Sequence, residues 1–339
     1  MICNANLAMI IKFHMEAQIS VITPVYNVRH FIRKCVESLM AQTFEGVEYI
    51  FVNDASSDGS IDILKSVVSK YPYKNVKIID HLENRGLPSS RKTGYEAANG
   101  KYIFNCDGDD WVEPTLLEKM YAAIVENDAD YAYCDFYLSY KNSERYMACP
   151  RFDTSDQALR YGYLSGAAKY NVWNKLIKRD LYEGVVFPVD HRKGGEDMIM
   201  LGVLSKARSV AYVPEALYHY VKTNSSAISE NFSEQRLIDI RYNADAAIKL
   251  LRQTYPIDLE TEIAFFKLNV KLPFLITEDP NKYEVWKEWY PEANEFIWRN
   301  KYQSFRNKLV QWLAAKEQFW AVRLYYKLVY KLIYGVIYR

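Results

Sequence analysis

Strand-like and helix-like segments alternate along the first 135 residues, and this alternation limits the fold more than any other feature of the chain. Residues 18–23 and 47–52 are short apolar runs typical of buried strands. The apolar residues from Val28 to Met40 recur every three or four positions, which is the spacing of one helix face. The alternation continues through strands expected at 76–80, 102–106 and 131–135, and helices expected after residue 60, at 88–98 and at 114–127. Such a series predicts βαβ units with right-handed crossovers, and therefore an α/β fold with a mainly parallel sheet flanked by helices.

Acidic residues follow several of the predicted strands. Asp54 comes after the second strand, and Asp107, Asp109 and Asp110 crowd together after the fourth. In open α/β sheets, ligands bind beyond the carboxyl ends of the strands. One carboxylate is enough to cap a helix, whereas crowded carboxylates repel one another unless a cation or a proton relieves them. Because the crowded donors are carboxylate oxygens, the cluster favours Mg²⁺ or Mn²⁺ over zinc.

Two common nucleotide-binding signatures are missing from the sequence. None of the 13 glycines forms a GxGxxG pattern, and the first strand runs into TPVYN at 23–27 where a dehydrogenase would carry its glycine-rich turn. A P-loop is equally absent. We therefore expect a metal and nucleoside-diphosphate site that does not depend on a glycine cradle.

Cysteine spacing and hydropathy bear on the cellular compartment. The five cysteines form no CxxC pair and no metal-ligand spacing, which predicts free thiols in a reducing cytosol. No apolar run approaches the roughly 18 residues of a membrane-spanning helix. The stretch before Met15 lacks the features of a signal peptide. Because Met15 stands directly before the first strand, we interpret residues 1–14 as an upstream start without a structural role.

The C-terminal segment differs in charge from the rest of the chain. Residues 301–339 contain eight of the 43 basic residues and one of the 42 acidic residues, so the remainder of the chain is acidic. One stripe at helical spacing carries Lys316, Arg323, Lys327 and Lys331, and the opposite stripe carries Tyr325, Leu328, Val329, Leu332 and Val336. This pattern predicts a basic amphipathic helix on a membrane surface. The alternative is a helix packed on the body or on a partner subunit; a nucleic-acid partner is not expected, because the body is acidic.

Four segments of the first half resemble a known family. ISVITPVYN (19–27), VEYIFVNDASSDGS (47–60), NRGLPSSRKTGYEAANGKYI (84–103) and CDGDDW (106–111) follow the order seen in family 2 glycosyltransferases of the GT-A fold. A looser likeness to bacterial polysaccharide and lipopolysaccharide sugar transferases follows in VWNKLIKRDLY (172–182), GGEDMIM (194–200), LYHY (217–220) and NSSAIS (224–229). The resemblance implies a nucleotide-sugar half at 15–137 and an acceptor half at 138–230. Beyond it, the sequence of residues 231–339 predicts a mostly helical C-terminal region.

The resemblance also implies roles for single residues on the donor side. Pro24 and Tyr26 match the turn that packs around a uracil ring, and Asp54 matches the carboxylate that accepts a hydrogen bond from the base. Arg91 matches an arginine that contacts the diphosphate, although Ser90 and Lys92 replace its usual neighbours. These positions are the expected nucleotide contacts.

Three further aspartates match the chemistry of the family. Asp107 and Asp109 correspond to the D-x-D pair: Asp109 would bind the metal that bridges the donor diphosphate, and Asp107 would lie near the ribose and the metal. Asp197, after Glu196, corresponds to the base that takes the proton of the acceptor hydroxyl. Spacing alone also fits a simpler interpretation, in which Glu196 and Asp197 open a helix whose dipole favours acids at its N-terminus.

Alternatives stay open for three other residues. Trp173 and Lys175 fit either acceptor or phosphate contacts, or a core side chain beside a solvated charge. His219 lies between Tyr218 and Tyr220, and strand alternation would turn it to the opposite face. It fits either a late metal ligand or, as the plainer interpretation, a surface histidine.

We therefore expect an inverting glycosyltransferase that uses Mn²⁺ or Mg²⁺ and transfers a sugar from a UDP-sugar. The acceptor is expected to be a saccharide or lipid-linked saccharide of a bacterial capsule or lipopolysaccharide, met at the inner face of the cell membrane by a peripheral enzyme. A sugar-nucleotide pyrophosphorylase is one alternative, but its glycine-rich basic N-terminal signature is absent. A non-catalytic nucleotide-binding scaffold is another, and intact Asp107, Asp109 and Asp197 argue against it.

Overall fold

The structure is a computed structural model that describes residues 17–190, 195–224 and 233–329. The chain divides into two compact units. Unit 1 comprises Met1–Thr154 and Asn171–Asn243, and unit 2 comprises Ser155–Tyr170 and Ala244–Arg339. The segment 1–14, interpreted as an upstream start, lies outside the described residues.

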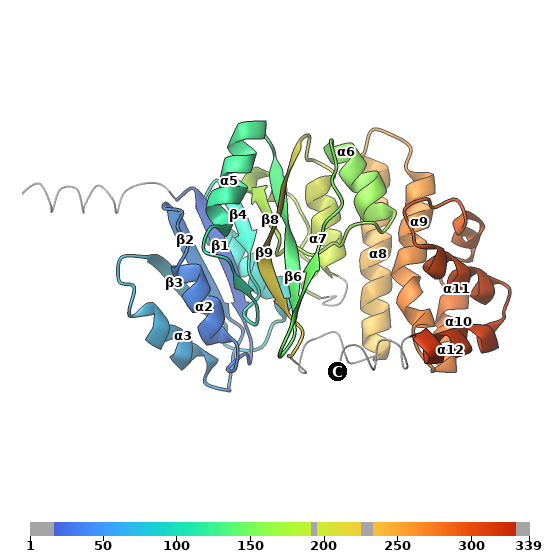
Figure 1. The fold of residues 1–339 in the computed structure, drawn as a ribbon, viewed down its shortest axis with the longest axis horizontal. Helices are drawn as coiled ribbons and strands as arrows, with labels where there is room; N and C mark the ends of the chain where they lie inside the picture. Colours follow the sequence, from blue (N-terminus) through green and yellow to red (C-terminus); the bar gives the residue numbers. More distant parts are fainter. Residues whose placement is uncertain (1–16, 191–194, 225–232, 330–339) are drawn as a thin grey trace, which may run out of the picture. The chain divides into compact units, whose positions relative to one another are not determined.

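Unit 1 is built around a sheet with helices packed against it (Figure 1). Its strands are β1 (Ile19–Val25), β2 (Val47–Asn53), β3 (Asn75–Asp80), β4 (Tyr102–Asn105), β5 (Trp111–Val112), β6 (Tyr131–Ser139), β7 (Glu144–Met147), β8 (Lys175–Lys178) and β9 (Val210–Val221). Its helices are α2 (Ile32–Met40), α3 (Ser60–Val68), α4 (Leu87–Glu96), α5 (Leu116–Asn127), the 3₁₀ turn η2 (Arg179–Tyr182) and α7 (Gly195–Leu204). The strands and helices expected in the first 135 residues are confirmed, with small shifts at their ends.

The strand order explains which loops come together. The strands follow the order β3–β2–β1–β4–β8–β6–β9–β5, and β7 pairs with β6. The first four strands in this order, β3, β2, β1 and β4, are parallel to one another, as expected. Strand β8 then inserts antiparallel between β4 and β6, while β6 and β9 are parallel. The sheet is therefore parallel in its first half and mixed in its second, because the short strand β8 enters after the βαβ series has ended.

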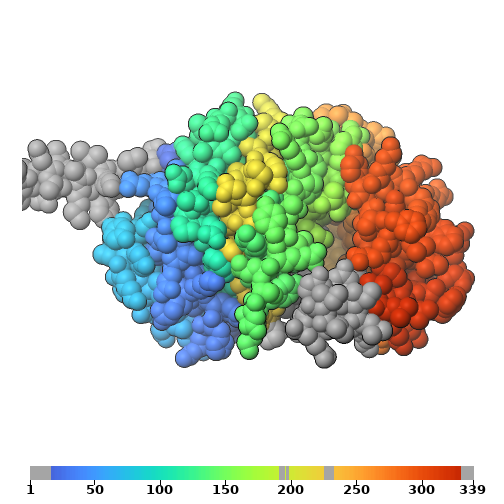
Figure 2. Space-filling model, viewed as in Figure 1, coloured from blue at the N-terminus to red at the C-terminus, as the bar shows by residue number. Residues whose placement is uncertain are grey.

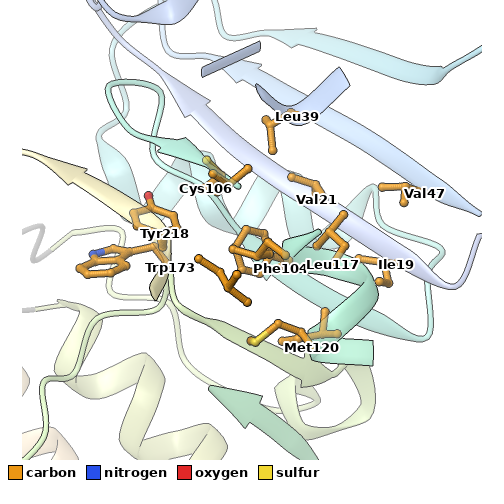
Figure 3. Close-up of a cluster of buried hydrophobic side chains, with 14 of the residues drawn as sticks. Ile19, Val21, Leu39, Val47, Phe104, Cys106, Leu117, Met120, Trp173 and Tyr218 are labelled. Carbon is orange, nitrogen blue, oxygen red and sulfur yellow. The ribbon is translucent and has the colours of Figure 1, made fainter. Parts of the chain in front are cut away.

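Both faces of β1, β2 and β4 are buried, whereas the edge strand β3 is partly exposed. Val21 on one face belongs to the same cluster of buried side chains as Leu39 of α2 (Figure 3). On the other face, Ile22 lies against α4, where a methyl group added at Gly94 would stand 2.3 Å from Ile22 Cγ2. Strands covered on both faces are apolar along their whole length. Three polar side chains that do lie inside these strands pair with one another: Ser20 of β1 donates to Glu48 of β2 at 2.6 Å, and Lys77 of β3 pairs with Glu48 at 2.8 Å.

Unit 2 is helical in its described residues, and its orange-to-red segments form one packed body (Figure 2). Its elements are α6 (Ser155–Gln157), the π-helix η1 (Ala158–Leu164), α9 (Glu260–Lys271), η3 (Leu272–Leu275), α10 (Pro280–Glu288), η4 (Pro291–Phe296), α11 (Phe305–Ala315) and α12 (Phe319–Tyr326). Helix α8 (Glu234–Thr254) carries the chain from unit 1 into unit 2. Arg160 of η1 pairs with Glu262 of α9 at 2.7 Å, which ties 155–170 to the C-terminal helices.

The prediction of one continuous basic helix in the tail is wrong. Helix α11 ends before Lys316, and Glu317 has a φ of 57°, in the left-handed region that terminates a helix. A new helix, α12, starts at Phe319 and carries Arg323. Lys316 therefore does not share a helix face with Arg323. The part of the predicted stripe beyond residue 329 lies outside the described residues.

Two further observations concern composition. The described cysteines, Cys35, Cys106, Cys134 and Cys149, carry free thiols, as their spacing predicts. Across the described ranges, no helix combines the length and the apolar character needed to cross a bilayer.

Unit 2 contains a fully buried lysine. Lys271 Nζ donates to the carbonyl oxygens of Trp289 and Tyr290 at 2.8 and 3.2 Å, and to Asn294 Oδ1 at 2.7 Å. It also lies 4.1 Å from the ring centre of Trp286. Burial lowers the pKa of Lys271 to about 7, although Glu292 acts in the opposite direction. The unfolded chain, with an ordinary lysine pKa of about 10.4, binds this proton at pH values where the folded chain does not.

We predict that the free energy of unfolding rises with pH above about 7. Where the unfolded state binds one more proton, stability increases by up to about 1.4 kcal/mol per pH unit. Urea titrations at pH 7, 8 and 9 measure this slope, and Lys271→Met removes it even though the variant is less stable. A flat wild-type curve would show that the three oxygens keep Lys271 protonated in the folded state.

Candidate active site

The carboxyl ends of β1, β2 and β4 lie at one edge of the sheet, because these strands are parallel neighbours. The turn after β4 passes close to the end of β1: a methyl group at Gly108 would stand 2.8 Å from the carbonyl oxygen of Pro24. Only glycine allows this approach. It brings the turn that carries Asp107 and Asp109 beside the TPVYN segment, two motifs about 80 residues apart in the sequence.

The residues expected to hold the base differ in exposure. Pro24 is buried within β1, whereas the ring of Tyr26 directly after the strand is 49% exposed. Asn27 follows with a φ of 51°, so the chain turns sharply there. An exposed ring above the strand ends is what stacking on a nucleobase requires.

Asp54 fixes the loop before α4. Its Oδ2 accepts a hydrogen bond from Gly86 N at 2.7 Å, and its Oδ1 accepts one from Arg85 N at 2.8 Å. His81 Nδ1 lies 2.8 Å from the same Oδ1, and His81 Nε2 lies 2.9 Å from Thr93 Oγ1. The carboxylate is 3% exposed. Asp54 thus positions the N-R-G segment, and its hydrogen bond to a base stays a prediction.

Asp107 and Asp109 have different partners in the turn after β4. Arg91 of α4 is 3% exposed and donates from Nη2 to Asp107 Oδ1 at 2.9 Å. Asn224, beyond β9, donates from Nδ2 to Asp109 Oδ2 at 2.8 Å. The arginine predicted to contact the diphosphate is thus placed directly beside the D-x-D pair.

The third aspartate, Asp110, is buried beneath this pair. Its Oδ2 accepts a hydrogen bond from the Tyr218 hydroxyl at 2.7 Å, and its Oδ1 accepts one from Val221 N at 2.8 Å. Desolvation, reinforced by the charges of Asp109 and Asp107, raises the pKa of Asp110 well above its usual range. The Tyr218 oxygen also accepts from Asp107 N at 3.2 Å. Asp110 and Tyr218 therefore fasten the turn to β9.

Trp173 and Lys175 lie in the interior of unit 1. Trp173 is 7% exposed and its ring stacks on Tyr218, with centroids 4.4 Å apart (Figure 3). Lys175 is 2% exposed, and its Nζ donates to Asn171 O at 2.5 Å and to Asn174 Oδ1 at 2.8 Å. The core interpretation of Trp173 agrees with the structure, whereas the solvated charge proposed for Lys175 is wrong, because the chain around residues 171–174 encloses its ammonium group.

The interpretation of His219 as a surface histidine is also wrong. The side chain is 1% exposed and is sandwiched between the rings of Trp111 and Tyr137, with centroids 3.3 and 4.9 Å away. Its Nε2 lies 3.0 Å from Glu113 Oε1, and its Nδ1 lies 2.9 Å from Glu144 Oε1. Strand β5, which pairs Trp111 with His219, covers it. The expected opposite orientation to Tyr218 and Tyr220 is confirmed, since those two rings pack on Trp173.

Glu196 and Asp197 lie in the first turn of α7, as the helix interpretation expects. Their side chains are outside the described part of the structure, so the role of Asp197 as a base stays a prediction. The helix start is placed by Gly195, where a methyl group would stand 2.6 Å from Pro188 Cγ and 3.4 Å from Pro88 Cγ. Because Pro88 opens α4, the backbone before Asp197 lies close to the loop that Asp54 holds.

The donor set after β4 suits a hard divalent cation. Asp107 and Asp109 offer carboxylate oxygens, and Mg²⁺ or Mn²⁺ is commonly held by one or two carboxylates together with substrate phosphates. Within the described ranges, no three His, Cys, Asp or Glu side chains converge in an arrangement that could hold a metal ion alone. The residues present therefore fit an ion that shares its coordination with a bound diphosphate.

A sequence model of the family described as "Glycosyl transferase family 2" matches residues 20–200. The chain belongs to glycosyltransferase family 2. The match covers the strand-end loops with Asp54, Asp107 and Asp109 and reaches the start of α7.

Curated relatives of this family 2 chain come from several bacteria. Glycosyltransferase GlyA of Streptococcus pneumoniae serotype 4 is 31% identical over 267 residues, which cover 75% of this chain and 37% of GlyA. The uncharacterized glycosyltransferase EpsJ of Bacillus subtilis is 30% identical over 223 residues, 62% of this chain and 63% of EpsJ. The chain thus spans less than two thirds of the length of these relatives.

Solved structures confirm the GT-A fold. The structure of Staphylococcus aureus TarS 1–349 in complex with UDP-GlcNAc has a TM-score of 0.67 at 18% identity and covers 94% of this chain and 92% of that one. The mannosyltransferase PcManGT from Pyrobaculum calidifontis, in complex with GDP-Man and Mn²⁺, has a TM-score of 0.54 at 16% identity. At these identities the likeness shows the fold alone.

Sequence reasoning assigned no role to His81, Tyr218 or Asn224. All three lie close to predicted site residues in space and far from them in sequence, which is why spacing could not reveal them. The one signal available was that Tyr218 and Asn224 fall within the segments LYHY and NSSAIS that resemble the family.

We predict that Tyr218→Phe lowers the free energy of unfolding by about 1–3 kcal/mol, because it leaves a buried Asp110 oxygen without its donor. Urea titration at neutral pH measures the change. Tyr73→Phe is the matched control, since Tyr73 is 65% exposed and loses only a solvated hydroxyl. Equal effects of the two substitutions would contradict a fastening role for the Tyr218 hydroxyl.

Proposed function

We propose that this chain is an inverting, metal-dependent glycosyltransferase that moves a sugar from a UDP-sugar to an acceptor hydroxyl during the synthesis of a bacterial cell-surface polysaccharide. The observation that carries the proposal is the turn after β4. There Asp107 lies 2.9 Å from the buried Arg91, and Asp109 is held by Asn224, at the edge where parallel strands end.

Several findings support the finer parts of the proposal. TarS, which shares the fold, binds UDP-GlcNAc, and PcManGT was solved with a nucleotide-sugar and Mn²⁺. GgaB of Bacillus subtilis, named a minor teichoic acid biosynthesis protein, is 28% identical over 264 residues. The acceptor in this proposal is a saccharide or lipid-linked saccharide, and the enzyme acts at the inner face of the cell membrane as a peripheral protein.

The reaction is a single displacement at the anomeric carbon. The bond between this carbon and the diphosphate oxygen breaks, and the oxygen keeps the electron pair. The acceptor oxygen forms its bond from the opposite side, so the configuration inverts. Asp197 accepts the proton of the acceptor hydroxyl, which contributes roughly 10²- to 10⁴-fold to the rate.

The residues after β4 stabilise the leaving group. A divalent ion held by Asp109 and Asp107 supplies charge stabilisation of the diphosphate, an effect of several kcal/mol by order of magnitude. Arg91 adds a fixed positive charge beside Asp107. Tyr26 offers its exposed ring to the uracil, and Asp54 holds the loop that borders it.

We predict that UDP and Mn²⁺ together stabilise the purified chain more than either ligand alone. Saturation at a hundred times the dissociation constant adds about 2.7 kcal/mol, which raises the melting temperature by roughly 5–11 °C in a domain of about the size of unit 1. Asp109→Ala abolishes the joint effect, whereas Asp153→Ala keeps it, since the side chain of Asp153 is 75% exposed. If UDP and Mn²⁺ together do not raise the melting temperature of the wild-type chain, the assignment of a uridine nucleotide is wrong.

We predict that Asp197→Asn slows release of UDP from a UDP-sugar by about 10²- to 10⁴-fold in the presence of acceptor, while the joint UDP and Mn²⁺ stabilisation persists. Asp180→Asn, on an exposed side chain of η2, is the matched control. Turnover by the Asp197 variant at the control rate would exclude Asp197 as the base. A wild-type chain that binds UDP but turns over no UDP-sugar would favour a non-catalytic scaffold.

A further inference from the structure

Unit 2 exposes three aromatic side chains that contact one another. Trp298, Phe305 and Trp312 are 46%, 68% and 38% exposed. The ring centre of Trp298 lies 5.9 Å from that of Phe305 and 6.4 Å from that of Trp312. We call these three residues the aromatic surface.

Two residues of the aromatic surface, Phe305 and Trp312, belong to α11, and Trp298 precedes this helix in the chain. Phe305 and Trp312 are seven residues apart, which places them on one side of the helix. The other side buries Val310 and Ala314 in unit 2. Single exposed apolar side chains are common, but adjoining rings form a patch of the kind that marks a binding surface.

The stretch of chain that carries this surface is basic. Residues 298–316 contain five basic residues and no acidic residue; the basic ones are Arg299, Lys301, Arg306, Lys308 and Lys316. Lys308 Nζ lies 5.9 Å from the ring centre of Trp298 and donates to Asn300 O at 3.3 Å. Lys308 therefore borders the aromatic surface, and the other four cations lie in the same short stretch of chain.

We propose that the aromatic surface, with its basic border, binds the headgroup region of an anionic lipid bilayer. Tryptophan rings favour the boundary between headgroups and acyl chains, and lysine and arginine are attracted to anionic headgroups. Phe305, the most exposed of the three rings, has no polar group and gains most from leaving water. This inference rests on the peripheral membrane location in the proposed function, and it names the residues that bind the membrane.

Other occupants fit this surface less well. A second copy of the chain in a two-fold contact would bring like cations against each other. Single-stranded nucleic acid stacks its bases on free aromatic faces, whereas these rings are in contact with one another. An anionic bilayer suits both features of this surface. Its headgroups attract the cations, and the apolar layer beneath the headgroups accepts the rings.

The test is co-sedimentation of the full chain with two kinds of vesicle, phosphatidylcholine alone and phosphatidylcholine mixed with phosphatidylglycerol. We expect binding to the mixed vesicles, weakened by salt because the attraction between charges is screened. The double variant Phe305→Ser and Trp312→Ser should lose about tenfold or more in affinity. Tyr73→Ser, which removes an exposed ring of unit 1, should bind as wild type does.

A second pair of substitutions tests the charge. Lys301→Glu with Lys316→Glu should bind mixed and neutral vesicles equally, because the rings remain and the preference for anionic lipid is lost. The melting temperature and the joint UDP and Mn²⁺ stabilisation are measured for every variant. Loss of vesicle binding with unchanged stabilisation separates a failed surface from a failed catalytic site.

Three results would overturn the proposal. One is a wild-type chain that does not bind the mixed vesicles. Another is a Phe305 and Trp312 variant that binds them as tightly as wild type. The last is a chain that does not bind vesicles and instead binds single-stranded RNA or self-associates. Loss of that interaction in the same double variant would show that it uses this surface.

Discussion

The buried carboxylate of Asp110 is the interaction on which the candidate site depends. It accepts hydrogen bonds from the Tyr218 hydroxyl and from Val221 N, both on β9. Because a buried charge without partners is strongly disfavoured, these contacts fix the turn after β4 against the last strand of unit 1. Asp107 and Asp109 are thereby held at the strand ends, one beside Arg91 and the other beside Asn224. The raised pKa of Asp110 favours its uncharged form, which reduces the repulsion among the three side chains.

The parts of the fold that the sequence predicted are those with a local periodic signal. Apart from the two-residue strand β5, the strands and helices up to β6 follow from runs of apolar residues and their spacing, and the crowded aspartates follow from the chemistry of like charges. The second half of the sheet gave no such signal, because β8 is short and joins antiparallel between strands that are distant in sequence. The continuous basic helix failed at Glu317, where a left-handed backbone conformation ends α11 in a way that charge spacing does not encode.

The burial of individual side chains was the property that the sequence predicted least well. His219 carries ring nitrogens suited to metal binding, yet Trp111 and Tyr137 enclose it and two glutamates occupy its nitrogens. Lys175 carries the positive charge that a phosphate contact needs, yet its ammonium group donates a hydrogen bond to the carbonyl oxygen of Asn171. In each case the deciding partner comes from a distant segment or a loop whose path the sequence does not show. The roles of Asp107, Asp109 and Asp197, in contrast, rested on motifs that lie wholly within one loop or helix start.

The order in which these partners are made has a consequence for synthesis of the chain. Tyr218 follows Asp110 by 108 residues, and Asn224 follows Asp109 by 115 residues. At about 5–20 residues per second, a growing chain displays its aspartate turn for several seconds before β9 leaves the ribosome. During that interval β1 to β4 can pair, but the three carboxylates have no framework to hold them together. A chain truncated before residue 210 would lack both Tyr218 and Asn224, so its aspartate turn would have neither of these partners.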